Sequence, residues 1–247
     1  MKSENGDTGT SDWKTLASEL RSLLNLQWSP VAITFSEDVT RSLPVYEAEM
    51  SEPTPDGRTG KVAAGCVFWI KGTERTFTTI PEDHGNCSVG SLTHGLKTIN
   101  EIVENSDVQS LLECEWVTKE MVSSLPVITR RPNFITYGPL EDSKIEPDVV
   151  LLRINAIQAM ILHDAVPRVR LEGKPQCHII PIAKEQNEVA VSVGCMLSRV
   201  RTGMRETEMT CAIPAARLAE VVDLLKTAKR SDTAVAAYAS EDAQRFT

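Results

Sequence analysis

The length, composition and charge of the chain exclude several classes of protein. A chain of 247 residues, 41% hydrophobic and 24% charged, can bury the core of a globular domain. Its net charge of −8 argues against a dedicated nucleic-acid binder, because such proteins neutralise phosphates with lysine and arginine. No apolar run approaches the roughly 18–20 residues that cross a bilayer, and the first ten residues lack an apolar signal core. We therefore expect a cytoplasmic protein that binds neither nucleic acid nor membranes.

The first half of the chain alternates helical and strand patterns. Residues 1–10 are polar and are expected to form a disordered tail. Apolar residues at helical spacing predict the first helix, and β-branched or apolar runs predict strands. The expected elements are a helix from Trp13 to about Leu26, a strand at 30–35, a loop at 36–60, a helix at 61–70, a strand at 76–80, a helix from Cys87 to about Asn105, and helical turns at 107–115 and 118–124.

The second half shows the same mixture. The expected elements are strands at 134–137 and 147–154, a helix capped by Asn155, a connecting stretch at 168–177, a short apolar segment at 177–184, a strand at 188–193, a helix at 198–204, a strand at 208–213, a helix from Ala215 to Lys229, and a polar C-terminal tail at 231–247. This pattern predicts a mixed α/β or α+β fold in a single compact domain over residues 11–230.

Two segments repeat the same order of features. Cys66 and Cys177 each precede an apolar stretch and a strand, and Cys87 and Cys195 each follow that strand and precede a helix. The intervals hold 20 and 17 residues. This pattern is typical of a duplicated αβ unit, with halves at about 30–125 and 132–230. The alternative is a chance resemblance between αβ segments. A pseudo-two-fold axis would place the two cysteine pairs face to face.

These four cysteines are the candidate metal ligands. Without an export signal, metal binding, catalysis or burial is expected rather than a disulfide framework. Cys66, Cys87, Cys177 and Cys195 lie at expected element boundaries or beside glycine, and four thiolates suit an iron–sulfur cluster such as [4Fe–4S], or a zinc ion. The chain has no Cys-x-x-Cys pair, and small buried hydrophobes are the alternative interpretation.

The segment from Glu82 to Gly90 carries further chemistry. His84 precedes Cys87, which lies at the expected start of a helix, where the helix dipole favours thiolate. Cys87 and His84 are therefore candidate catalytic residues, as nucleophile and base. Arg199, Arg201 and Arg205 follow Cys195 closely and would balance the charge of a cluster or hold an anionic substrate; a solvated helix face is the alternative. His84 and Arg199 are the candidate cofactor-binding residues. No nucleotide-binding or hydrolase motif is present.

Several short motifs together resemble one family. They are Ser29–Ile33, Gly65–Cys66, Glu82–Gly90, Glu146–Leu151, Asn155–Met160, Ser192–Cys195 with Ser198–Arg199, and Glu208–Met209 leading to Ile213–Pro214. Over residues from about Trp13 to Lys229, the chain resembles the domain of unknown function 169 family, an uncharacterised group of prokaryotic proteins. The resemblance implies cysteines at the four candidate positions, whereas Cys114 and Cys211 fall outside the family pattern. Relatives often read Cys-Pro-x-Gly where this chain has Ser88 after Cys87.

Three functional hypotheses follow, and the sequence does not decide between enzyme and binding protein. The first is an iron–sulfur protein that transfers electrons, or performs cluster-assisted chemistry on a small molecule, with a small molecule or a redox protein as partner. The second is a zinc-stabilised module that binds a small molecule or a partner without catalysis. The third is a thiol enzyme or redox sensor that uses Cys87.

Overall fold

The computed structural model describes residues 12–38, 43–46 and 63–246, so the tail expected at 1–10 and much of the loop expected at 36–60 lie outside it. The described residues form one seven-stranded mixed sheet with helices, which confirms the expected α+β fold class. Neighbouring strands are antiparallel, except that β5 and β6 are parallel. In sheet order the strands are β2 (Phe77–Thr79), β3 (Phe134–Pro139), β1 (Val31–Ser36), β4 (Val149–Asn155), β7 (Glu208–Pro214), β6 (Ala190–Ser192) and β5 (Arg170–Glu172).

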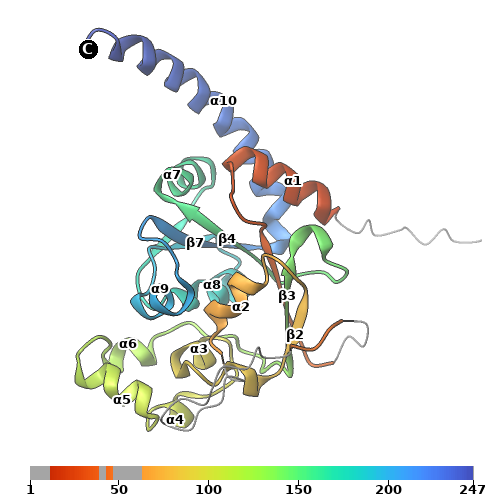
Figure 1. Cartoon of the computed structure of the whole chain (residues 1–247), viewed down its shortest axis with the longest axis vertical. Coiled ribbons are helices and arrows are strands. Elements are labelled where there is room, and N and C mark those ends of the chain that lie inside the picture. The colour runs from red at the N-terminus through yellow and green to blue at the C-terminus, as the bar shows by residue number, and fades with distance from the viewer. Residues whose placement is uncertain (1–11, 39–42, 47–62, 247) are drawn as a thin grey trace, which may run out of the picture.

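Helices cover both faces of the sheet (Figure 1). Side chains alternate along a strand, so Val150 and Leu152 of β4 join one core while Val149 and Leu151 join the other. The first core is closed by α1 (Trp13–Leu24), α7 (Ala156–Ala165) and α10 (Leu218–Ala243), and the second by α2 (Gly65–Lys71) and α8 (Ile179–Gln186). On the α2 side lie α9 (Met196–Thr202), α3 (Ser88–Thr93), α4 (Ile99–Ile102), α5 (Ser106–Glu113) and α6 (Lys119–Ser123).

The strands on the two sides of the centre of the sheet occupy equivalent positions. β1 and β4 pair at the centre, β3 and then β2 follow on one side, and β7 and then β6 follow on the other. Equivalent hydrogen bonds close the two halves: the Leu140 N–H donates to the Pro30 carbonyl (2.8 Å), and the Ala215 N–H donates to the Asp148 carbonyl (3.0 Å). This correspondence is what duplication of an αβ unit would produce.

Two stretches in the middle of the chain differ from expectation. The helix expected from Cys87 to Asn105 is divided into α3 and α4, because Gly95 adopts a left-handed turn (φ +69°). A Cβ there would lie 2.4 Å from the Ile128 carbonyl oxygen, so the turn requires glycine. The stretch expected to be a connection at 168–177 contains β5, a three-residue strand with little buried surface to mark it in the sequence.

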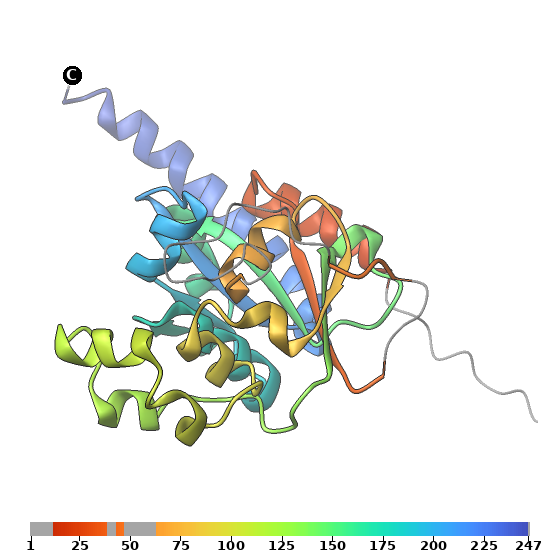
Figure 2. The ribbon, with the colours of Figure 1, turned by 60° about the horizontal axis from the view of Figure 1, so that its bottom comes forward.

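The C-terminal helix also differs. It was expected to end near Lys229, but α10 continues to Ala243 and extends away from the rest of the molecule (Figure 2). Its last part is rich in alanine, which has the highest helix propensity, although few of its side chains are buried. Within the described part of the chain, no helix combines the length and the apolar character that crossing a membrane requires.

Candidate functional site

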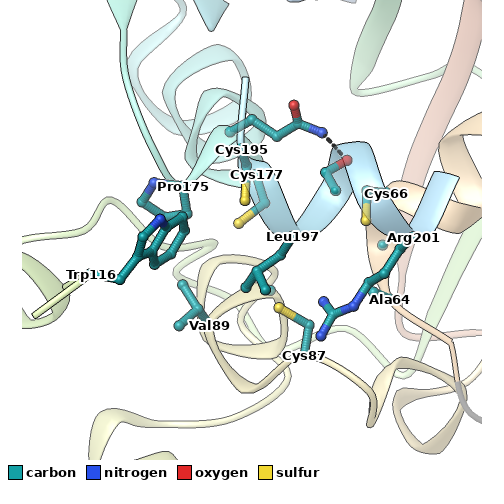
Figure 3. A pocket seen from close by; sticks show the side chains of 14 residues that line it. Ala64, Cys66, Cys87, Val89, Trp116, Pro175, Cys177, Cys195, Leu197 and Arg201 are labelled. Atoms are coloured by element: carbon teal, nitrogen blue, oxygen red, sulfur yellow. Dashed lines mark hydrogen bonds between the residues drawn. The ribbon is translucent and has the colours of Figure 1, made fainter. Parts of the chain in front are cut away.

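The N-terminal ends of four helical segments meet on one side of the sheet, and each carries a cysteine. Cys66 is the second residue of α2, and Cys177 lies in the 3₁₀ helix Gln176–His178 that leads into α8. Cys87 directly precedes α3, and Cys195 directly precedes α9. All four line one pocket of about 400 Å³, counting its part open to solvent (Figure 3). The fold thus brings together the four cysteines that the sequence singled out.

The other two cysteines lie elsewhere. Cys114 is exposed at the end of α5, and Cys211 is fully buried in β7, within the core on the opposite face of the sheet. Neither lines the four-cysteine pocket. A buried cysteine in a strand is an ordinary small apolar core residue.

The pocket lining repeats between the two halves of the fold. Its first set is Ala64, Gly65, Cys66, Cys87, Val89 and Gly90, and its second set, in the same order, is Pro175, Gln176, Cys177, Cys195, Leu197 and Ser198. α2 packs against α9, and α3 packs against the 3₁₀ helix before α8, so contacts cross from one half to the other. Only Trp116 and Arg201 have no counterpart in the lining. Trp116 was not singled out from the sequence, whereas Arg201 is one of the three arginines noted after Cys195.

Hydrogen-bond donors lie near three of the sulfur atoms, and the one beside Cys177 is the hydroxyl of Thr93. The Cys195 sulfur accepts hydrogen bonds from the backbone N–H groups of Ser198, Leu197 and Gln176. The Cys66 sulfur accepts one from the Ser198 hydroxyl, which in turn accepts from Gln176 Nε2 at 2.6 Å (Figure 3). Such donors stabilise thiolate and orient it as a metal ligand. The hydroxyl of Ser198 is therefore held in place by the residue that precedes Cys177 in the chain.

Loss of hydration dominates the acidity of these thiols. Burial raises the pKa of the Cys66 thiol to about 11, despite the hydrogen bond from Ser198. Burial and then the neighbouring Cys87 raise the pKa of Cys177 well above its ordinary value, and burial also raises the pKa of Cys195. Without a metal, these three groups are protonated at neutral pH, and a bound metal ion would displace their protons. They are unsuited to act as free nucleophiles.

The thiols lie around the pocket rather than at one point. Among the described residues, no three histidine, cysteine, aspartate or glutamate side chains are spaced to hold a metal ion as they stand. A single zinc ion needs four ligand atoms within about 2.3 Å of its centre.

The loop that carries Cys87 is fixed from two sides. The Ala63 N–H donates to the Asp83 carbonyl (2.8 Å), and the Asn86 N–H donates to the Ala63 carbonyl (3.0 Å), which ties this loop to the chain before α2. The N–H and hydroxyl of Ser88 donate to the Asp107 carboxylate at 2.9 and 2.7 Å. A proline at position 88 would lack that N–H. Asp107 belongs to α5, and its role was not predicted from the sequence because its contact with Ser88 is made only in the folded protein.

His84 and Arg199 lie behind the pocket, not in it. His84 is buried, its Nε2 lies 3.0 Å from the Thr79 hydroxyl, and burial followed by the nearby His94 lowers its pKa well below the ordinary value. Among the described residues, no hydrogen bond joins His84 to Cys87. The Arg199 guanidinium donates to the carbonyls of Val193 (2.9 Å) and Glu208 (2.8 Å). Neither side chain belongs to the pocket lining.

The buried histidine His94 predicts loss of stability in acid. Its Nδ1 lies 2.9 Å from the Gly90 carbonyl, and burial lowers its pKa to about 4. The unfolded chain binds a proton near pH 6.5, so the stabilisation is complete above pH 6.5 and is lost as the pH falls toward 4. We expect the free energy of unfolding to fall by about 3 kcal/mol over this interval. Urea unfolding at several pH values measures it.

The matched variant is His94→Gln, whose side-chain amide can still donate to the Gly90 carbonyl but cannot be protonated. It should be less dependent on pH between 6.5 and 4 than the unsubstituted protein. Equal slopes in the two proteins would show that the buried imidazole does not control acid stability.

Comparisons with known proteins place the chain in one family. The model of the family described as DUF169, uncharacterised ArCR, matches residues 19–223, which is most of the chain. No curated protein and no solved structure shows a significant match. The matched range contains all four pocket cysteines together with Trp116 and Arg201.

Proposed function

Because the chain belongs to the DUF169 family, whose description assigns no activity, we propose a function from the site itself: Cys66, Cys87, Cys177 and Cys195 bind an iron–sulfur cluster. One observation carries the proposal. Four thiols from separate parts of the sequence converge on one pocket, and the remaining cysteines do not. Iron–sulfur clusters are held by cysteine thiolates in such sets of four.

The arrangement of the thiols around the pocket suits a cluster. They surround a shared pocket and come from different sides of it. A polyatomic group presents its iron atoms at several points, and so it would reach ligands that come from opposite sides of a pocket. The pseudo-symmetric lining supports the same view, since each half of the fold supplies an equivalent pair of cysteines.

The surrounding residues have identifiable roles in this proposal. A bound cluster would supply one-electron transfer. The N–H groups of Leu197, Ser198 and Gln176 stabilise negative charge on the Cys195 sulfur, and the Ser198 hydroxyl does so at Cys66. Hydrogen bonds to sulfur raise the reduction potential by favouring the more negative state. The protein's contribution is thus to position four thiolates and to set their electrostatic environment.

The test is the metal content of the full chain purified without oxygen. We expect iron and acid-labile sulfide in matching amounts, with the visible absorption of thiolate-bound iron. Zinc without sulfide would replace the proposal with a structural metal site. Neither metal would replace it with metal-free thiol chemistry, and the reactivity of Cys87 toward an alkylating agent would then be measured.

A further inference from the structure

The two residues that break the symmetry of the pocket point to a second ligand. The position in α3 that is equivalent to Arg201 is Thr93, a buried residue whose hydroxyl donates to the Gly90 carbonyl at 3.0 Å. Trp116 belongs to the connection between α5 and α6, and this helical insertion has no equivalent between α9 and β7. Four thiolates need neither residue as a ligand. A large cation and a large aromatic ring were thus added to an otherwise repeated site.

Arg201 is a cation close to the thiols, and its charge acts to lower the pKa of Cys66, against the larger effect of burial. Two neighbouring arginines are engaged, because Arg199 donates to the carbonyls of Val193 and Glu208, and Arg205 Nη1 lies 3.3 Å from Gln27 Oε1. Within the described residues, Arg201 has neither an ion-pair nor a hydrogen-bond partner, and Figure 3 shows its guanidinium extending toward Cys87 at the pocket. A guanidinium presents paired N–H donors that match a carboxylate.

Trp116 forms an apolar wall of the same pocket. Its ring is held in the cluster that includes Val89, and the Nζ atom of Lys174 lies 4.6 Å from the ring centroid. Figure 3 shows Leu197 between Trp116 and Arg201 in the view into the pocket. Trp116, Leu197 and Arg201 are all half-buried, so they border the side of the pocket that solvent reaches. A flat apolar group would pack against this wall.

We propose that the solvent-facing side of the pocket binds a small carboxylate with a flat apolar body, with its carboxylate on Arg201 and its body against Leu197 and Trp116. The inference rests on the proposed function, because it assigns the four thiols to the cluster and leaves these three side chains to a ligand beside it. It names the chemical class of small molecule that would bind next to the cluster. The whole chain has a net charge of −8, so its overall field does not attract anions. Binding of an anion would therefore depend on a local cation such as Arg201.

The probe is benzoate, added to the full chain purified without oxygen, with binding measured by saturation-transfer NMR. Benzamide serves as the uncharged analogue of the same shape. We expect benzoate to bind at least about tenfold more tightly than benzamide, as loss of a charge-assisted hydrogen bond implies. Arg201→Gln should remove this preference, Trp116→Ala should weaken both probes, and Arg230→Gln, on the exposed part of α10, should change neither.

Iron and sulfide are measured on every sample, so the two proposals fail separately. Arg201→Gln protein that keeps its cluster and loses the preference for benzoate supports the inference. Loss of the cluster in that variant would overturn it, because Arg201 would then be a counter-charge for the cluster. Cluster-containing protein that does not distinguish benzoate from benzamide would also overturn it, while leaving the proposed function intact. If the protein contained no iron but still bound benzoate through Arg201, the carboxylate site would be supported and the proposed cluster would be overturned.

Discussion

Replacing Cys177 by serine is expected to lower the iron and sulfide content of anaerobically purified protein by roughly tenfold or more. Cys177 lies in the 3₁₀ helix before α8, where its sulfur faces Cys87 and loses most of its hydration. Serine is a poor ligand for iron in a cluster that prefers thiolates. The same loss is expected for serine at Cys66, Cys87 or Cys195, because all four line the pocket.

Cys114→Ser is the matched control. Cys114 is exposed and lies outside the pocket, so its replacement should leave iron, sulfide and the visible spectrum unchanged. Far-UV circular dichroism of each variant separates loss of the metal from loss of the fold. If Cys177→Ser kept full iron and sulfide in folded protein, Cys177 would not be a ligand.

A graded variant tests the environment of the sulfur atoms. Ser198→Ala removes the hydroxyl that donates to Cys66 but leaves all four thiols. It should retain the cluster and shift its reduction potential downward, since a hydrogen bond to sulfur favours the reduced, more negative state. An unchanged potential would mean that Ser198 only supports Gln176.

The sequence pattern predicted the mixed fold and most strands, because both depend on local periodicity. The apolar run of β4 and the capping residue Asn155 were sufficient to mark a strand followed by a helix, and Asn155 Oδ1 does accept from the Gln158 N–H at 3.0 Å. The division of the helix after Cys87 was not predictable in the same way. It depends on the close approach of Ile128 to Gly95, which is a tertiary contact.

The grouping of the four cysteines was suggested by the repeat and by the family resemblance, but which of the arginines after Cys195 lines the pocket was not predictable, for a local reason. Successive residues of an α-helix are rotated by about 100°, so Arg199 and Arg201 point in nearly opposite directions. Which one faces the pocket depends on where α9 begins, and Cys195 fixes that start as the residue before the helix. Trp116 was missed because an insertion reaches the pocket only through the packing of α3 to α6.

An ion pair on the other side of α9 should be important for stability. Arg153 Nη2 lies 2.7 Å from Glu208 Oε2, and the two side chains are only 9% and 10% exposed. Burial alone would raise the pKa of Glu208, but hydrogen bonds from Arg153 and from the Arg205 N–H hold it below its usual value. Arg153 also lies over the Trp28 ring, 4.6 Å from its centroid. The pair thus joins β4 to the start of β7.

Arg153→Met is expected to lower the free energy of unfolding by about 3–5 kcal/mol, because it leaves the Glu208 carboxylate buried without its cation. Denaturant unfolding at neutral pH measures the change. In the double variant Arg153→Met/Glu208→Met, neither charge remains, so much of the lost stability should return. A double variant as unstable as Arg153→Met would show that packing against Trp28, rather than the unpaired charge, accounts for the loss. Because Arg199 also binds the Glu208 carbonyl, the iron content of both variants reports whether this pair helps to hold α9 against the cysteine pocket.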